Sequence, residues 1–502
     1  MQTREDSELW VADGVHATTG RYLLDPLPAE ALAELAARAT SHTDSAETQL
    51  LTARAGRDAL LSFGLAEGID RGDLSQTGWG VVFPAVRPGS PEALRQAAIR
   101  EALAPLLQHR QQQAASAVES YYQEFHGHRG VRPGDTNHSF LGRLKVDPAA
   151  PADPEAMPYY LLLVGSPVDI SFTLQYQLDV TYAVGRIDFA TPDEYASYAR
   201  SVVAAEQGPA RRSRELAFFA VSNPDDAATR LAREQLITPL SAALQRNRRL
   251  PGWSLRHHLD RQASKQNLGR LLGGDQTPAL LFTASHGVSF DPDDPLQARR
   301  QGALLCDEWQ NPRPPTPLGE DMYFSGDDLA SSADLRGLIA LNFACYSGGT
   351  PEFDEYAPAG APRPRIAARP FVSGLHTRLL AHPGGGALAC IGHIERVWSH
   401  SLPAAGAASN RLNVFKSAME VLMKGLPVGA ALEYFNARYA QLGADMSTML
   451  QDLAHLGGDA AHGTRQDLAR SWAAHNDARD YVITGDPAVR LRFAADEPRP
   501  AT

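Results

Sequence analysis

The chain has 502 residues, of which 43% are hydrophobic and 21% are charged, a composition typical of a folded protein with a large core and two or three domains. Its formal net charge is −11 at pH 7. Binding to the negatively charged phosphates of a nucleic acid requires clustered positive charge, so we expect no nucleic-acid binding. Three cysteines, Cys306, Cys345 and Cys390, are too few for a disulfide framework and favour a reducing compartment.

The N-terminal residues indicate the expected compartment. Residues 1–8 contain neither a basic n-region nor an apolar h-region, and the chain has no apolar run of about 18 residues. We therefore expect a cytoplasmic protein without a membrane span. His376, His382, His393 and His400 lie close together in the sequence but lack His-Glu-x-x-His or Cys-x-x-Cys spacing, so we expect no metal and no cofactor.

The first third of the chain predicts a small α/β part. Residues 1–45 have weak patterning and are predicted to form an N-terminal appendage. Residues 46–113 predict two helical stretches, the second over 91–113, around a strand at 78–84. The proline-rich segment 147–158 predicts an exposed linker, which separates an N-terminal α/β part at 46–150 from a catalytic domain at 151–495.

Strands and helices alternate through the rest of the chain. Apolar runs predict strands at 159–165, 180–185, 215–222, 386–392 and 481–484. Helices are predicted at 192–206, from the cap residues 223–226 to about 246, at 371–381 and at 410–456. This alternation predicts an α/β fold with a mostly parallel sheet and helices on both faces.

Two further apolar runs each stop at one reactive residue with glycine close behind. The run in 279–287 ends at His286, and the run in 338–349 ends at Cys345. Both are typical of buried strands in a parallel sheet, whose carboxyl ends form sites at one edge. A histidine about 60 residues before a cysteine follows the order found in caspases, where the gap is about 50. The pair predicts a thiol peptidase.

Three other segments, in the same order along the chain, carry a family resemblance. Residues 161–170, 182–187 with the helix start after them, and 481–488 resemble the strand and turn, the Val-Gly-Arg-Ile stretch and the Gly-Asp-Pro close of gingipain-type peptidases. These are caspase-like cysteine peptidases of clan CD. The resemblance implies a caspase-like three-layer sandwich, a His/Cys dyad without a required third residue, and cleavage of protein substrates.

The sequence also departs from that family. Ser166 and Ser171 stand where gingipains have Asp and Pro, and gingipains are secreted. An intracellular, regulated protease is therefore the expectation, and bacterial defence proteases of this type suggest a defence role by analogy. The alternative is a catalytically inactive caspase-like scaffold or binding protein.

The proposed chemistry assigns a role to each residue of the pair. His286 supplies the proton transfers, Cys345 is the nucleophile, and the backbone amides of Gly287 and Cys345 form the oxyanion hole. The alternative for Cys345 is a buried core cysteine. Cys390 is the rival nucleophile, but the apolar residues on both sides of it predict core packing, and Cys306 is predicted to take no part.

The resemblance further implies a pocket for the side chain before the cleaved bond. Asp179 takes the place of the pocket acid of arginine-specific gingipains, so we predict cleavage after Arg, then Lys. Capping of a turn is the alternative role for Asp179. Asp169 is the alternative pocket acid, and Trp398 is predicted to form a wall of the pocket.

Two loops suggest regulation by proteolysis. An upstream activating protease could cut the linker at 147–158, which would make the chain a zymogen. In the loop after the nucleophile, the prolines that follow Arg363 and Arg369 should block cleavage there. Arg365 is therefore the predicted self-processing site.

Overall fold

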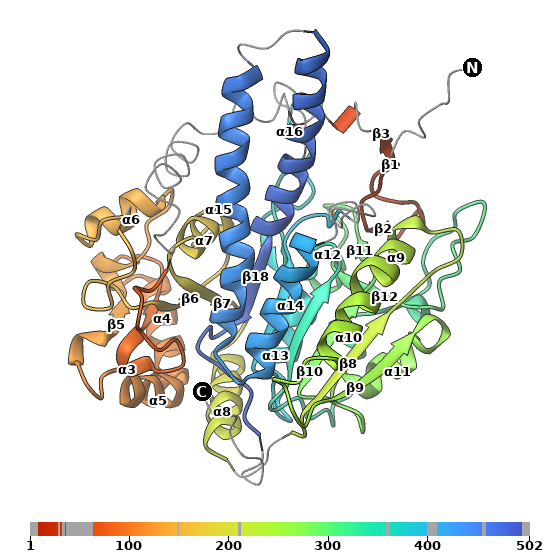
Figure 1. Cartoon of the computed structure of the whole chain (residues 1–502). Helices are drawn as coiled ribbons and strands as arrows, with labels where there is room; N and C mark the ends of the chain where they lie inside the picture. The colour runs from red at the N-terminus through yellow and green to blue at the C-terminus, as the bar shows by residue number, and fades with distance from the viewer. Residues whose placement is uncertain are drawn as a thin grey trace.

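A ten-stranded sheet runs through the centre of the molecule (Figure 1). The computed structural model describes residues 9–28, 31, 32, 36, 64–148, 150–208, 212–354, 356, 362–398, 409–453 and 458–493. Strand order across the sheet is β5-β4-β6-β7-β18-β17-β14-β10-β8-β9. Nine pairings hold these ten strands together, and all of them are parallel except one. The predicted α/β architecture with a mostly parallel sheet is confirmed.

The one antiparallel pairing, between β17 and β18, divides the sheet into two parallel halves of opposite direction. The first half contains β5 (Tyr122–Phe125), β4 (Trp79–Val82), β6 (Tyr160–Val164), β7 (Ala183–Ile187) and β18 (Tyr481–Gly485). The second half contains β17 (Ala389–His393), β14 (Ile339–Phe343), β10 (Leu280–Ala284), β8 (Glu215–Ala220) and β9 (Ser254–Leu259). Strands in different halves therefore end at opposite edges of the sheet.

Helices cover both faces of the sheet, which gives three layers. On one face, His376 of α13 (Gly374–Leu380) hydrogen-bonds Asn342 and Thr484 of two strands. On the other face, Phe415 of α14 (Ser409–Met423) and Phe435 of α15 (Val428–Leu453) pack on Tyr481. The other α-helices with bounds in the described residues are α3 (Leu74–Thr77), α4 (Pro91–Ala102), α5 (Ala104–Ala114), α6 (Asn137–Arg143), α7 (Phe172–Asp179), α8 (Pro192–Gln207), α9 (Ala227–Leu231), α10 (Thr238–Gln245), α11 (Lys265–Leu271), α12 (Gln297–Arg300) and α16 (Gly458–Arg479).

Two predicted elements differ in detail from the structure. The helix predicted at 91–113 is broken at Leu103 into α4 and α5, because Pro105 has no N–H to donate to the preceding turn. Strand β7 begins at Ala183, and helix α7 fills the residues immediately before the predicted strand. The first helical stretch predicted after residue 46 falls in part on residues 46–63, which lie outside the described residues.

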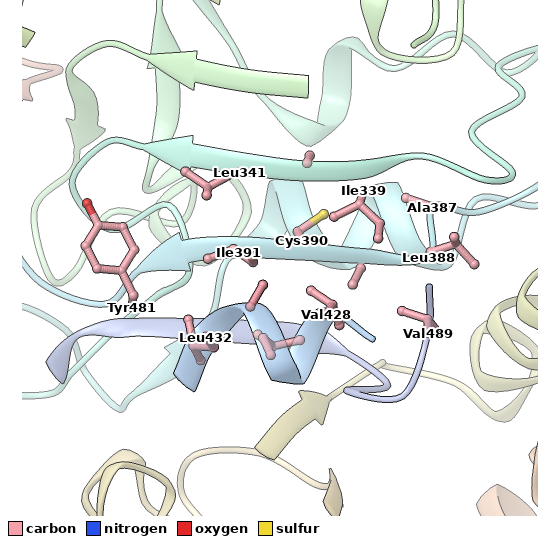
Figure 2. Close-up of a cluster of buried hydrophobic side chains, with 14 of the residues drawn as sticks. Ile339, Leu341, Ala387, Leu388, Cys390, Ile391, Val428, Leu432, Tyr481 and Val489 are labelled. Atoms are coloured by element: carbon pink, nitrogen blue, oxygen red, sulfur yellow. The ribbon is translucent and has the colours of Figure 1, made fainter. Parts of the chain in front are cut away.

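The core around β17 shows how the central strands are stabilised. Cys390, Ile339 and Val428 lie among the fully buried side chains that Figure 2 displays. Such side chains each stabilise the fold by roughly 1.5–3 kcal/mol when removed from water. Cys390 is thus packed in the core, as its apolar neighbours predict.

The N-terminal residues lie against the second half of the sheet. In the predicted appendage the described strands are β1 (Leu9–Trp10), β2 (Val15–His16) and β3 (Leu27–Pro28). A separate four-stranded sheet has the order β13-β12-β11-β2, with β13 (Tyr323–Phe324), β12 (Ala303–Leu305) and β11 (Gly287–Ser289). Because β11 follows directly after His286, residues 9–28 are placed at the predicted site and not apart from it. No helix in the described ranges is long and apolar enough to cross a membrane.

Candidate active site

His286 and Cys345 come together at the ends of two neighbouring strands. Strands β10 and β14 pair in parallel, with Ala284 opposite Phe343 at their carboxyl ends. One further residue after each strand, Ser285 or Ala344, leads to His286 or Cys345, and the side chains of His286 and Cys345 are fully buried. The apolar runs of the sequence thus deliver the two reactive residues to one edge, as strand direction requires.

Gly287 lies directly against the backbone of Cys345. A Cβ atom at this position would stand 1.9 Å from the Cys345 carbonyl oxygen and 2.9 Å from the Cys345 nitrogen. Only glycine fits such a contact. The close approach brings the two backbone segments that carry the predicted oxyanion-hole amides next to each other, and the oxyanion hole itself stays a prediction.

The residue that follows Cys345 has a strained backbone conformation. Tyr346 has a φ of 56°, which costs a non-glycine residue about 1–3 kcal/mol. The Ser347 hydroxyl secures the turn, because it donates to Ala344 O at 2.7 Å and accepts from His393 N at 3.0 Å. Neighbouring residues therefore fix the direction in which Cys345 points.

Asp226 is a partner of His286 that the sequence interpretation assigned only to helix capping. Its Oδ2 lies 2.6 Å from His286 Nε2, and both side chains are buried. Its carboxylate also caps α9 by accepting from Ala228 N and the Thr229 hydroxyl. The sequence signals only that Asp226 follows a buried strand, β8; the pairing of β8 with β10 places that strand end at the same sheet edge as His286.

The contact between Asp226 and His286 shifts the pKa of each group in the direction that favours its charged form. Burial alone would lower the pKa of His286, but the charge and hydrogen bond of Asp226 raise it. Burial would likewise raise the pKa of Asp226, yet the contact with His286 lowers it. Asp226 therefore orients the imidazole and stabilises its protonated form.

Two aromatic rings enclose the imidazole of His286. The Trp309 ring stands edge-on with its centroid 5.8 Å away, and Tyr22 lies tilted at 5.7 Å. The Tyr22 hydroxyl accepts a hydrogen bond from Asn311 Nδ2 at 3.0 Å. Tyr22 belongs to the N-terminal segment, so part of the enclosure comes from that segment.

A peptide group of the chain itself lies between the thiol and the imidazole. The Cys345 thiol donates to the Asp13 carbonyl oxygen at 2.6 Å, and Gly14 N–H donates to His286 Nδ1 at 2.8 Å. Val397 N–H donates to the sulfur at 3.2 Å. Burial, and next the negative charge of Asp13, raises the pKa of Cys345 well above its usual range, so the thiol is protonated in this arrangement.

Of the three residues predicted for the pocket, Trp398 lies beside this peptide. It forms a bridge with Ala12, next to Asp13 in the chain. Asp179 instead accepts a hydrogen bond from Val184 N at 3.2 Å, and burial raises its pKa well above the usual range. This contact matches the turn-capping alternative, and no contact in the described structure links Asp179 to the dyad.

Asp169 lies in the turn after β6 and accepts from the Ser166 hydroxyl at 2.8 Å. Because β6 belongs to the first half of the sheet, this turn leaves the edge opposite to His286 and Cys345. Asp169 lines a cavity of about 1290 Å³, and neither dyad residue lines that cavity. Its role as a pocket acid stays a prediction.

The remaining candidate residues have ordinary surroundings. Arg365 is exposed and donates to Glu352 and to the Ala368 carbonyl oxygen, and self-processing there stays a prediction. Cys306 is buried and donates to Leu304 O at 3.4 Å. Among the described residues no group of three or more His, Cys, Asp or Glu could hold a metal ion; His400 lies outside them.

No family model and no curated protein matches the chain. Its structure is similar to that of the Arg-specific cysteine proteinase gingipain R, with 10% identity, a TM-score of 0.47 and coverage of 86% of this chain and 80% of that chain. A structure described only as a protease matches with 13% identity, a TM-score of 0.46 and coverage of 84% and 80%. The complex of RgpB pro- and mature domains from Porphyromonas gingivalis matches with 11% identity, a TM-score of 0.42 and coverage of 83% and 80%.

Proposed function

We propose that this chain is a cysteine endopeptidase with Cys345 as nucleophile, His286 as general acid and base, and Asp226 as the residue that positions His286. One observation carries the proposal. A single peptide group, between Asp13 and Gly14, lies within hydrogen-bond distance of both the Cys345 sulfur and His286 Nδ1. A nucleophile and a proton carrier that both reach one peptide bond are what amide cleavage requires.

The proposed reaction uses the groups in a fixed order. His286 Nδ1 takes the proton from the Cys345 thiol, and the thiolate sulfur bonds to the carbonyl carbon of the substrate. As the carbon–nitrogen bond breaks, the proton passes from Nδ1 to the leaving amine, which leaves a thioester on Cys345. Water then gives a proton to Nδ1 as its hydroxide oxygen adds to the thioester carbon. The carbon–sulfur bond breaks to release the carboxylic acid, and the thiolate takes the proton back from Nδ1, which restores the thiol. The amides of Gly287 and Cys345 are proposed to bind the oxyanion.

Specificity and regulation are finer parts of the proposal. Cleavage after Arg, then Lys, rests on the family resemblance alone, because Asp179 hydrogen-bonds the start of β7. A cytoplasmic location, action on protein substrates and activation by an upstream protease are likewise proposed from the sequence. Trp398 contributes to the substrate-binding surface through its place beside Ala12.

A fluorogenic peptide panel tests the activity. Peptides with Arg, Lys, Asp or Leu before the reporter are incubated with Gly14→Ala, a substitution that shifts the peptide group lying on Cys345 and His286, and with Cys345→Ala, His286→Ala and the control Cys390→Ala in that background. We expect Cys345→Ala and His286→Ala to lose cleavage and Cys390→Ala to keep it. Equal cleavage by Cys345→Ala and by its parent chain would refute Cys345 as the nucleophile. Absence of cleavage in every chain would favour the inactive-scaffold alternative, and preference for Asp over Arg would refute the basic specificity.

A further inference from the structure

Residues 10–16 run through the site as an extended peptide. Ala12 forms an antiparallel bridge with Trp398, and Asp13 N–H donates to Val397 O at 2.8 Å. These backbone contacts pair the segment with Val397 and Trp398 as an added β-strand would pair, which is a recurring way for proteins to bind peptides. The segment thus lies where an extended substrate would pair with the chain beside the nucleophile.

Two side chains of residues 10–16 are buried against other parts of the chain. Trp10 is 3% exposed and Ala12 is 2% exposed. Both belong to a cluster with Tyr356, Trp398 and Trp472. In this cluster the Tyr356 ring packs edge-on against Trp398 and against Trp472. The groove therefore accepts an aromatic side chain three residues before the peptide group at the dyad, and a small side chain one residue before Asp13.

Gly14, which follows Asp13 in that peptide group, has a backbone conformation that favours glycine. Gly14 has a φ of 118°, and a Cβ there would lie 2.5 Å from Leu23 Cδ1 and 3.3 Å from the Cys345 sulfur. Leu23 N–H donates to Gly14 O at 3.1 Å. Val15 is then held by parallel pairing with Val288. Any residue larger than glycine at position 14 must therefore shift the backbone of this segment.

The two hydrogen bonds at the dyad have the wrong direction for cleavage. The Cys345 thiol donates to the carbonyl oxygen of Asp13, while attack needs a thiolate facing the carbonyl carbon. His286 Nδ1 accepts from Gly14 N–H, so it neither receives the thiol proton nor holds a proton for the leaving amine. The peptide group separates the nucleophile from its base.

We propose that residues 10–16 are an inhibitor in cis that occupies the peptide-binding groove of the protease and is bound in an uncleaved form. This inference rests on the proposed function, because it names the occupant of the same site. Substrates that displace the segment carry an aromatic side chain at the place of Trp10 and a small one at the place of Ala12. The enzyme becomes active when these residues leave the groove.

Alkylation of Cys345 measures the occupancy without requiring peptidase activity. The chain is treated with iodoacetamide, and the labelling of each cysteine is followed by peptide mass spectrometry. We expect Gly14→Ala and Trp10→Ala each to label Cys345 about tenfold faster than wild type. Cys306 and Cys390, which are also buried, serve as internal references. Trp253→Ala, a tryptophan whose indole donates to Met423 O far from the segment, is the matched control.

Addition of a synthetic peptide completes the test. A peptide with the sequence of residues 9–16 should slow the labelling of Cys345 in Trp10→Ala, and a peptide with Ala at the place of Trp10 should do so much less. Unchanged Cys345 labelling in both folded variants would overturn the inhibitor, whatever the peptidase panel shows. Fast labelling without cleavage of any panel peptide would support the inhibitor and count against the proposed activity alone. Loss of residues 1–13 from wild type, but not from Cys345→Ala, would contradict the uncleaved form.

Discussion

Cys345 and Cys390 belong to the same half of the sheet, yet their burial has different origins. Both side chains have no exposed surface, and burial raises the pKa of both thiols. Strands β14 and β18 pair with β17 on either side of Cys390, which lies in the buried core (Figure 2). By contrast, Cys345 lies at a strand end and contacts Asp13 and Val397. Equal burial can therefore mean permanent packing in one place and a removable cover in another.

The largest expected difference between the two cysteines is in catalysis. In the Gly14→Ala background, Cys345→Ala should lower kcat/KM for the best panel peptide by at least about 10³-fold, because the nucleophile is lost. Cys390→Ala in the same background should stay within about threefold, because Cys390 contacts only core side chains. Comparable losses in the two variants would remove the distinction between them.

Asp226→Asn should have the next largest effect. Asparagine can still cap α9, but it removes the charge that raises the pKa of His286. We expect kcat to fall by about 10²-fold, and the acid limb of the pH profile for kcat/KM to move to lower pH. Asp73→Asn, which alters the N-cap of α3 at a distance, is the control. An unchanged pH profile would leave Asp226 as a helix cap only.

The pKa of the Cys345 thiol should change when residues 10–16 are displaced from it. Burial and the charge of Asp13 raise its pKa, so displacement of residues 10–16 readmits water, removes that charge and lowers the pKa. The pH at which iodoacetamide labelling of Cys345 reaches half its maximum should therefore fall in Gly14→Ala relative to wild type. The same midpoint in both chains would mean that the segment does not set the ionisation.

The smallest expected effect concerns stability. Cys390→Ala removes a buried sulfur from a packed core and should lower the free energy of unfolding by about 1 kcal/mol. Cys345→Ala removes a sulfur at the edge of the sheet and should change the free energy of unfolding less. Urea unfolding followed by circular dichroism compares them, and an equal or larger loss for Cys345→Ala would contradict the proposed difference in packing.

The strands that carry the site were predictable because both faces of each are buried. Runs such as those ending at His286 and Cys345 need apolar residues throughout, and this local signal survives in the sequence. Strand β9 (Ser254–Leu259) escaped prediction, since at the edge of the sheet it carries Arg256, His257 and His258. The reversal between β17 and β18 depends on pairing between distant segments, which no local pattern records.

The two missing parts of the site are also non-local. Asp226 follows a strand that proves to be the neighbour of β10, and its capping role was visible while its contact with His286 was not. Residues 10–16 have no periodic pattern, because Trp10, Ala12 and Gly14 each fit a different surrounding formed by chain far away in sequence. Their place became apparent only from the contacts in three dimensions.

The central position of β18 has a consequence for biosynthesis. Strand β18 (Tyr481–Gly485) follows every other strand in the sequence, yet it lies between β7 and β17. A nascent chain interrupted before Tyr481 would leave both neighbours as open sheet edges. The ribosome therefore delivers residues 10–16 and the dyad well before the strand that joins the two halves, and the segment is available to cover the thiol as soon as that junction forms.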